Sequence, residues 1–131
     1  MNLTLNLALW ISAGLLAVVL LVSSTTKLFV PKEKLATLPL GGWTGDASVG
    51  LVKALGALEL LAAVGLVLPA AVDIAPILVP LTAACVVLLM VGAMIMHLRR
   101  HEAVGVVLNV AYLALAAFVT WGRFGPESFT G

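Results

Sequence analysis

The sequence contains little charge. Charged residues make up 10% of its 131 residues and the net charge at pH 7 is +1, whereas soluble proteins contain about 25% charged residues. So few charges cannot cover a globule in water, and no excess of basic residues marks a nucleic-acid-binding surface. We therefore exclude an ordinary soluble domain and expect no nucleic-acid partner.

Cysteine and histidine are also scarce. Cys85 is the only cysteine, so the chain has neither an intramolecular disulfide nor a cysteine pair for dithiol redox chemistry. We expect Cys85 to be buried in mid-helix and unreactive, which argues against thiol catalysis. His97 and His101 offer too few ligands for a metal site. No metal is predicted, and a non-catalytic role is favoured although the sequence leaves the question of enzyme activity open.

Apolar residues, in contrast, are abundant and form long runs. They make up 63% of the chain, and four apolar stretches lie at 7–26, 49–68, 76–97 and 103–121. Each stretch is long enough to cross a hydrocarbon core of roughly 30 Å as a helix, the form that satisfies its own backbone hydrogen bonds. The sequence predicts an all-α integral membrane protein, a single domain over residues 1–131 with four transmembrane helices.

The breaks between the stretches indicate how the helices connect. Short connections make sequential helices antiparallel neighbours, which gives an up-and-down bundle. Only the first break, at 30–48, is long. Within it, Pro31 followed by KEKL is typical of the first turn of a helix, and the sequence PLGG would end that helix. We expect a short interfacial helix between the first and second transmembrane helices.

The basic residues predict the orientation. Arg123 alone lies on one side of the membrane, and five basic residues lie in the first and third loops: Lys27, Lys32, Lys34, Arg99 and Arg100. By the positive-inside rule, the first and third loops are cytoplasmic and both termini lie outside. Trp43 is expected near the inner face, as part of an aromatic belt.

One acidic residue lies in the middle of an apolar stretch. Glu59 is flanked by apolar residues on both sides, in ALELL at 57–61. A carboxylate at this depth costs at least about 2.5 kcal/mol, so Glu59 must be protonated, paired or next to a watery cavity. Gly56 and Ala63 share its helix face and leave room for a neighbouring helix or a ligand. Glu59 is either a packing group or a functional group, and we favour the functional interpretation.

Further polar side chains fall in the same half of the membrane as Glu59. Tyr112 lies at a similar depth, and Asn109 lies on the same face as Tyr112, nearer the cytoplasm. Lys27 and His97 lie at the cytoplasmic ends of their helices. Structural alternatives exist, since lysine anchors interfaces, histidine caps helices and asparagine bonds helices together. We predict a ligand-binding pocket, open to the cytoplasm, formed by Glu59, Lys27, His97, Asn109 and Tyr112.

These segments resemble the DoxX-like family of small four-helix membrane proteins. The similarity lies in Lys27-Leu28, in GALELLAAVGLVLP at 56–69, in AMIMHLRR at 93–100 and in Asn109. The resemblance implies a multi-pass protein of a bacterial or archaeal inner membrane, with relatives linked to thiosulfate and quinone oxidation or to oxidative-stress complexes. The family fold is distantly similar to that of vitamin K epoxide reductases, whose dithiol chemistry Cys85 alone cannot perform.

Three functions are compatible with the sequence. We favour a protein whose pocket around Glu59 binds a small apolar ligand, either a quinone or a lipid, or which serves a membrane redox or stress complex. Quinone is then the one cofactor under consideration. The alternatives are proton-coupled export of small molecules by a dimer and a purely structural role in a membrane complex. The expected partners are membrane lipids and either further copies of the chain or a larger complex.

Overall fold

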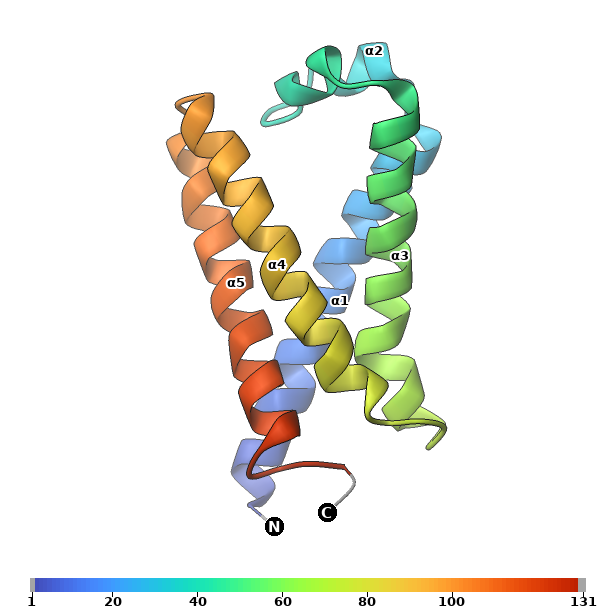
Figure 1. Ribbon diagram of the computed structural model, residues 1–131, viewed down its shortest axis with the longest axis vertical. Helices are drawn as coiled ribbons and strands as arrows, with labels where there is room; N and C mark the ends of the chain where they lie inside the picture. Colours follow the sequence, from blue (N-terminus) through green and yellow to red (C-terminus); the bar gives the residue numbers. More distant parts are fainter. Residues whose placement is uncertain (1, 130–131) are drawn as a thin grey trace.

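The computed structural model describes residues 2–129, and every regular element in this range is a helix (Figure 1). Four helices are long and apolar enough to cross a membrane: α1 (Leu3–Phe29), α3 (Val49–Ala71), α4 (Leu78–Arg99) and α5 (Ala103–Phe124). The predicted all-α fold with four transmembrane helices is confirmed. The chain is a multi-pass membrane protein.

Polar side chains ahead of two helices explain where those helices begin. The side chain of Asn2 accepts a hydrogen bond from the Leu5 N–H at 3.0 Å, and the Ser48 hydroxyl accepts one from the Leu51 N–H at 3.1 Å. Such N-caps satisfy backbone donors that the first helical turn leaves free. The cap at Asn2 lets α1 begin ahead of the apolar run that predicted it.

The long helices form two antiparallel pairs. α1 packs along α3 and α4 packs along α5, and the contacts between the two pairs are fewer. The pairs lie close together at the end of the molecule where both chain termini are found, and they diverge toward the opposite end (Figure 1). We call these the termini end and the capped end. Successive long helices run in opposite directions, including α1 and α3, which the long segment 30–48 connects, so the bundle has the predicted up-and-down arrangement.

The capped end takes its name from two short helices that lie across it. α2 (Lys32–Leu35) follows Pro31, as predicted, and η1 (Gly42–Asp46) is a 3-10 helix that was not predicted. Leu35 and Thr44 are the buried side chains of this cap. Leu40, between the two helices, has a φ of 62°, which is a strained conformation for a residue with a bulky side chain.

The hydrophobic core lies where the two helix pairs meet. Residues from all four long helices form it: Ala13, Leu16, Leu20, Ala63, Leu66, Val79, Ala83, Val86, Met90, Ala116 and Val119. On α3 the buried positions recur every three or four residues, which places them on one helix face. Glu59 belongs to this buried face, so it does not point toward lipid.

Cys85 does not lie in the core. Its side chain is exposed on α4, and the expectation that it is buried within the protein is wrong. Only 28% of the spanning window of α4 is buried inside the molecule, so a position in mid-helix more often faces lipid than protein. The single thiol remains in apolar surroundings, but those surroundings are the bilayer.

A buried arginine joins the two ends of the chain. Arg123, in the last turn of α5, is only 3% exposed. Its Nη1 donates to Oδ1 of Asn6 at 2.9 Å and to the backbone oxygen of Glu127 at 3.0 Å. Its guanidinium lies 5.8 Å from the ring centroid of Trp10 and 4.0 Å from that of Phe129. Arg123 thus ties α5 to α1 and to the C-terminal segment.

Candidate ligand-binding cavity

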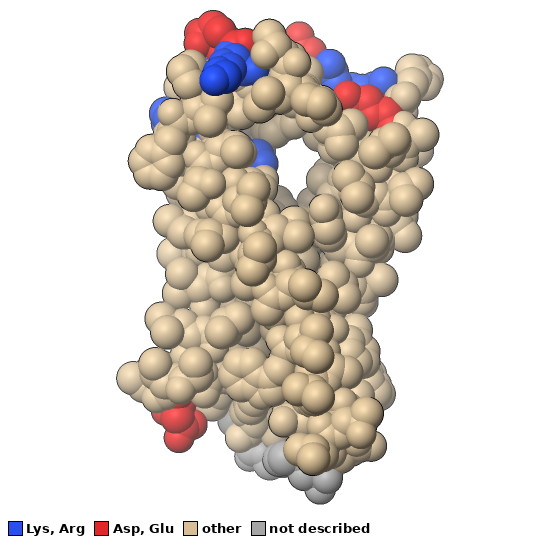
Figure 2. Space-filling view, turned by 180° about the vertical axis from the view of Figure 1, so that it is seen from behind, with Lys and Arg blue, Asp and Glu red and all other residues tan. Residues whose placement is uncertain are grey.

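A cavity of about 850 Å³ lies between the diverging helix pairs. Most of its wall is aliphatic, and this part includes Val18, Val19, Leu20, Val22, Leu51, Leu55, Leu88, Leu89, Met90, Met96 and Leu108. In the space-filling view an opening passes through the molecule below the cap (Figure 2). Leu88 lines the cavity and is also 73% exposed, so the cavity is accessible from the side, where the bilayer would be.

All five predicted binding residues line this cavity. Lys27 comes from α1, Glu59 from α3, His97 from α4, and Asn109 and Tyr112 from α5. Glu59, His97 and Asn109 are between 6% and 8% exposed. Each long helix therefore contributes at least one polar side chain to a single, otherwise apolar surface.

Lys27 and Glu59 form an ion pair in the cavity wall. The distance between Lys27 Nζ and Glu59 Oε1 is 2.8 Å, and Nζ also donates to the Ser23 hydroxyl at 2.5 Å. Lys27 thus turns inward instead of reaching to the membrane surface. A Cβ atom at Gly56 would lie 2.9 Å from the Cβ of Lys27. The absence of a side chain at Gly56 lets α1 approach α3 closely enough for the pair to form.

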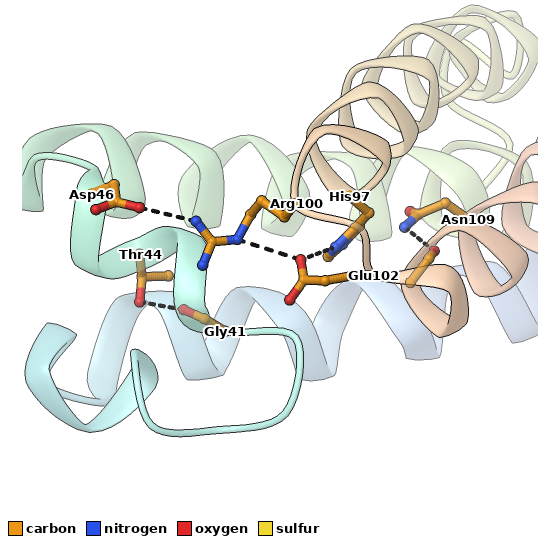
Figure 3. Close-up of polar contacts among 8 residues, drawn as sticks. Gly41, Thr44, Asp46, His97, Arg100, Glu102 and Asn109 are labelled. Atoms are coloured by element: carbon orange, nitrogen blue, oxygen red, sulfur yellow. Dashed lines mark hydrogen bonds and ion pairs between the residues drawn. The ribbon is translucent and has the colours of Figure 1, made fainter.

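His97 is held by Glu102. The distance between His97 Nδ1 and Glu102 Oε1 is 2.9 Å, and Arg100 Nε lies 3.5 Å from the same carboxylate oxygen (Figure 3). Arg100 also donates from Nη1 to Oδ2 of Asp46, in η1, at 2.9 Å. These contacts form a continuous polar chain from the cavity wall to the cap.

The end of α4 explains why Glu102 reaches His97. The Glu102 N–H donates to the His97 carbonyl at 2.9 Å, and the His101 N–H donates to the Leu98 carbonyl at 3.1 Å. This pair of bonds is a Schellman motif, which requires a left-handed residue after the helix. His101 provides it, with a φ of 57°. The motif folds the chain back so that Glu102 lies over the imidazole of His97.

The two polar residues of α5 are less constrained. Asn109 Nδ2 donates to the Gly105 carbonyl of its own helix at 2.7 Å, so Asn109 does not join two helices as the structural alternative required. The Tyr112 hydroxyl forms no hydrogen bond with any residue in the described part of the chain. Both side chains therefore retain hydrogen-bonding capacity for a ligand.

The cap contributes cavity residues that the sequence did not indicate. Trp43, expected in an aromatic belt, lies instead in the cavity wall, with its ring centroid 5.9 Å from Lys27 Nζ. Leu40 lines the cavity beside it. Glu102 was also missed. Its spacing of five residues from His97 is not a helical spacing, so only recognition of the turn would have predicted their contact.

The cavity combines a neutralised ion pair with several hydrogen-bonding groups. Among the described residues no group of three or more His, Cys, Asp or Glu side chains is placed to hold a metal ion. The polar groups occupy limited parts of the wall and the rest is hydrocarbon. Such a surface suits a molecule with one polar head group and an apolar body.

These features define a small membrane protein with four spanning helices and a polar-tipped cavity between two helix pairs. The model of the DoxX-like family matches residues 11–119. The chain therefore belongs to the DoxX-like family, as its resemblance suggested. Comparison with curated proteins and with solved structures found no match. The family match includes every predicted binding residue, from Lys27 to Tyr112.

Proposed function

We propose that the protein binds a small, largely apolar molecule with a polar head group, a quinone or a lipid, between its two helix pairs. The observation that carries this proposal is the cavity of about 850 Å³, with its aliphatic wall and five polar side chains. Pockets for small ligands typically measure about 300 to 1,000 Å³ and combine apolar walls with a few polar groups.

The polar groups suit the head of such a ligand. The Lys27 ammonium and the Tyr112 hydroxyl are donors for a carbonyl oxygen, and the Trp43 ring, near Lys27, offers an aromatic surface. An isoprenoid or acyl tail would leave through the side opening, where Leu88 is exposed. Head group and tail would then each meet the surroundings that suit them.

We further propose that the capped end faces the cytoplasm, with both termini outside, in the cell membrane. Charged side chains gather at the capped end (Figure 2), and five of the seven basic residues lie in or next to the two loops there. A ligand would enter from the cytoplasmic half of the bilayer. The protein would also serve a membrane redox or stress complex, as a homo-oligomer or with other subunits. It would bind the same ligand in that complex.

Fluorescence of Trp43 provides the test. Quinones quench nearby tryptophans, so decylubiquinone should quench the protein in phosphatidylcholine nanodiscs in a saturable manner. Trp43→Phe should remove the quenchable component. Trp121→Phe is the matched control, because Trp121 is 55% exposed on α5 and does not line the cavity. Glu59→Gln should weaken the quenching while the protein remains folded, because the ion pair with Lys27 is lost.

The outcomes separate the proposal from its alternatives. Quenching that does not saturate, and that affects Trp121 as strongly as Trp43, would mean simple partitioning into lipid and would contradict quinone binding. Mass spectrometry of the purified protein then decides whether a lipid is retained. If the protein binds neither a quinone nor a lipid but shows proton-driven flux of small molecules in proteoliposomes, that result would support an exporter. If it binds neither and shows no flux, the structural role is the remaining function.

A further inference from the structure

We propose that Glu102 fixes His97 in the tautomer that carries its proton on Nδ1, so that Nε2 accepts a hydrogen bond from the ligand. The ligand of this cavity would therefore carry a hydroxyl group. This inference rests on the ligand-binding function proposed above. It makes Glu102 a positioning residue and narrows the ligand to phenols, hydroquinones and alcohols with an apolar body.

The contact between the two side chains determines where the proton lies. A carboxylate only accepts hydrogen bonds, so the Nδ1 atom that lies 2.9 Å from Glu102 Oε1 must be the donor. A neutral imidazole has a single N–H group, and a partner at one nitrogen determines the role of the other. Nε2 of His97 is then an acceptor in the wall of the cavity.

The charged side chains around the ring already have partners. Glu102 already has a cation beside it, since Arg100 Nε lies 3.5 Å from the same oxygen, and Arg100 is paired with Asp46 in the cap. From α1 and α3 the cavity receives Lys27 and Glu59, which neutralise each other. From α5 it receives only the uncharged Asn109 and Tyr112. Nε2 is therefore the ring nitrogen left for a ligand in a mostly apolar wall, where a polar atom without a partner is costly.

The ring has little freedom to rotate away from Glu102. Gly105 of α5 lies directly against it, so that a Cβ atom at this position would be 2.6 Å from His97 Cγ and 2.7 Å from Nδ1. The backbone bond from Glu102 to the His97 carbonyl fixes the position of Glu102 relative to the ring. His97, 7% exposed, is thus preorganised before a ligand arrives.

The cavity then has two poles of opposite hydrogen-bonding character. At the Lys27 pole the protein donates, which suits any oxygen of the ligand. At the His97 pole it accepts, which suits an O–H group and leaves a carbonyl oxygen facing the Nε2 lone pair. A buried acceptor without a partner costs binding free energy. A hydroquinone satisfies both poles, whereas a quinone satisfies only the first.

Nitrogen NMR tests the tautomer directly and needs no ligand. The chain has two histidines, so His101→Gly leaves His97 as the only imidazole and keeps a residue that tolerates the left-handed turn. ¹⁵N-histidine spectra in nanodiscs should show a neutral ring protonated at Nδ1. Adding Glu102→Ala should shift the ring toward protonation at Nε2, and Glu102→Gln, whose amide oxygen still accepts, should retain the original tautomer. A doubly protonated ring, or one protonated at Nε2, would overturn the inference.

A matched pair of redox-inert probes tests the ligand class. 4-Decylphenol has a hydroxyl group, and 4-decylanisole replaces its proton with a methyl group. The phenol should displace decylubiquinone from Trp43 about tenfold more effectively, the effect of one hydrogen bond. This preference should vanish in Glu102→Ala and persist in Glu102→Gln.

The two proposals fail in distinguishable ways. Saturable decylubiquinone binding with equal displacement by the phenol and the anisole would overturn the hydroxyl preference and leave the cavity function intact. No saturable binding of decylubiquinone, the phenol or a lipid would refute the cavity function, and the NMR result would then describe only the turn. If Glu102→Ala does not fold, the tautomer and the phenol preference of the parent protein decide the question.

Discussion

The ion pair of Lys27 and Glu59 lowers the energetic cost of burying each of the two charges. Each alone is an expensive charge inside an apolar helix bundle, but at 2.8 Å they neutralise one another. Their side chains are 17% and 8% exposed, so most of the desolvation cost is paid when the protein folds. The pair contributes little net stability, yet either partner alone would be a serious defect.

A double-mutant cycle measures this dependence. Lys27→Met should lower the free energy of unfolding by about 3 kcal/mol, because it leaves the carboxylate without its partner, and Glu59→Leu should have an effect of similar size. The double variant should be close to wild type in stability, since two apolar side chains replace two desolvated charges. Unfolding in mixed micelles followed by circular dichroism gives the values. Strictly additive losses would show that the two charges do not depend on one another.

At the scale of single residues, the sequence predicted positions better than contacts. Glu59, Lys27, His97, Asn109 and Tyr112 could be selected because polar groups are rare and costly in apolar helices, and all line one cavity. Their partners could not be selected in the same way. Glu102 and Trp43 lie outside the apolar runs, where polar and aromatic residues are ordinary. Their positions depend on turns that the hydrophobic pattern does not encode.

At the scale of elements, the turn between α4 and α5 is built around an unfavourable residue. His101 adopts a φ of 57°. In this conformation the Cβ atom lies too close to the backbone, which destabilises the folded state. Glycine is the usual residue at this position of a Schellman motif. The turn nevertheless forms, because its two backbone bonds and the Glu102 contact support it.

His101→Gly should therefore stabilise the protein. We expect a gain of up to about 1 kcal/mol, the relieved strain less the larger entropy of glycine in the unfolded chain. Leu98→Gly is the matched control: it places glycine inside α4, where it should destabilise by about 1 kcal/mol or more. Thermal unfolding of both variants in the same detergent makes the comparison. A loss of stability in His101→Gly would mean that the imidazole makes an additional contact.

The sequence predicted some helices better than others. The four long helices could be predicted because each apolar run had to satisfy its backbone inside lipid. α1 begins ahead of its apolar run because Asn2 caps it, whereas α3, capped by Ser48, begins where its run begins. η1 has no hydrophobic period to reveal it, and its approach to Arg100 is a tertiary contact. The cap is therefore the element that sequence reasoning described least well.

At the scale of the whole molecule, the two ends differ in construction. At the termini end the core is continuous and Arg123 links α1, α5 and the C-terminal segment. At the capped end the helix pairs are separated by the cavity and joined by contacts such as that between Arg100 and Asp46. The bundle could be predicted from short connections, but the divergence depends on side-chain packing and could not.

Cysteine labelling tests the orientation of the whole chain. In a Cys85→Ser background, Lys34→Cys should be protected from a membrane-impermeant maleimide in intact cells, whereas Asp73→Cys should react. Both positions are exposed and lie at opposite ends of the molecule. Permeabilised cells provide the control, because both cysteines should then be labelled. Reaction of Lys34→Cys in intact cells would reverse the orientation and open the cavity to the outer leaflet.

The divergence of the helix pairs also leaves them apart at the capped end, whereas they pack together at the termini end (Figure 1). A bilayer exerts lateral pressure on every protein embedded in it. At the capped end this pressure pushes the two helix pairs toward each other. A ligand between the pairs would resist their approach. The lateral pressure in the leaflet around the capped end would therefore affect how readily the cavity is filled.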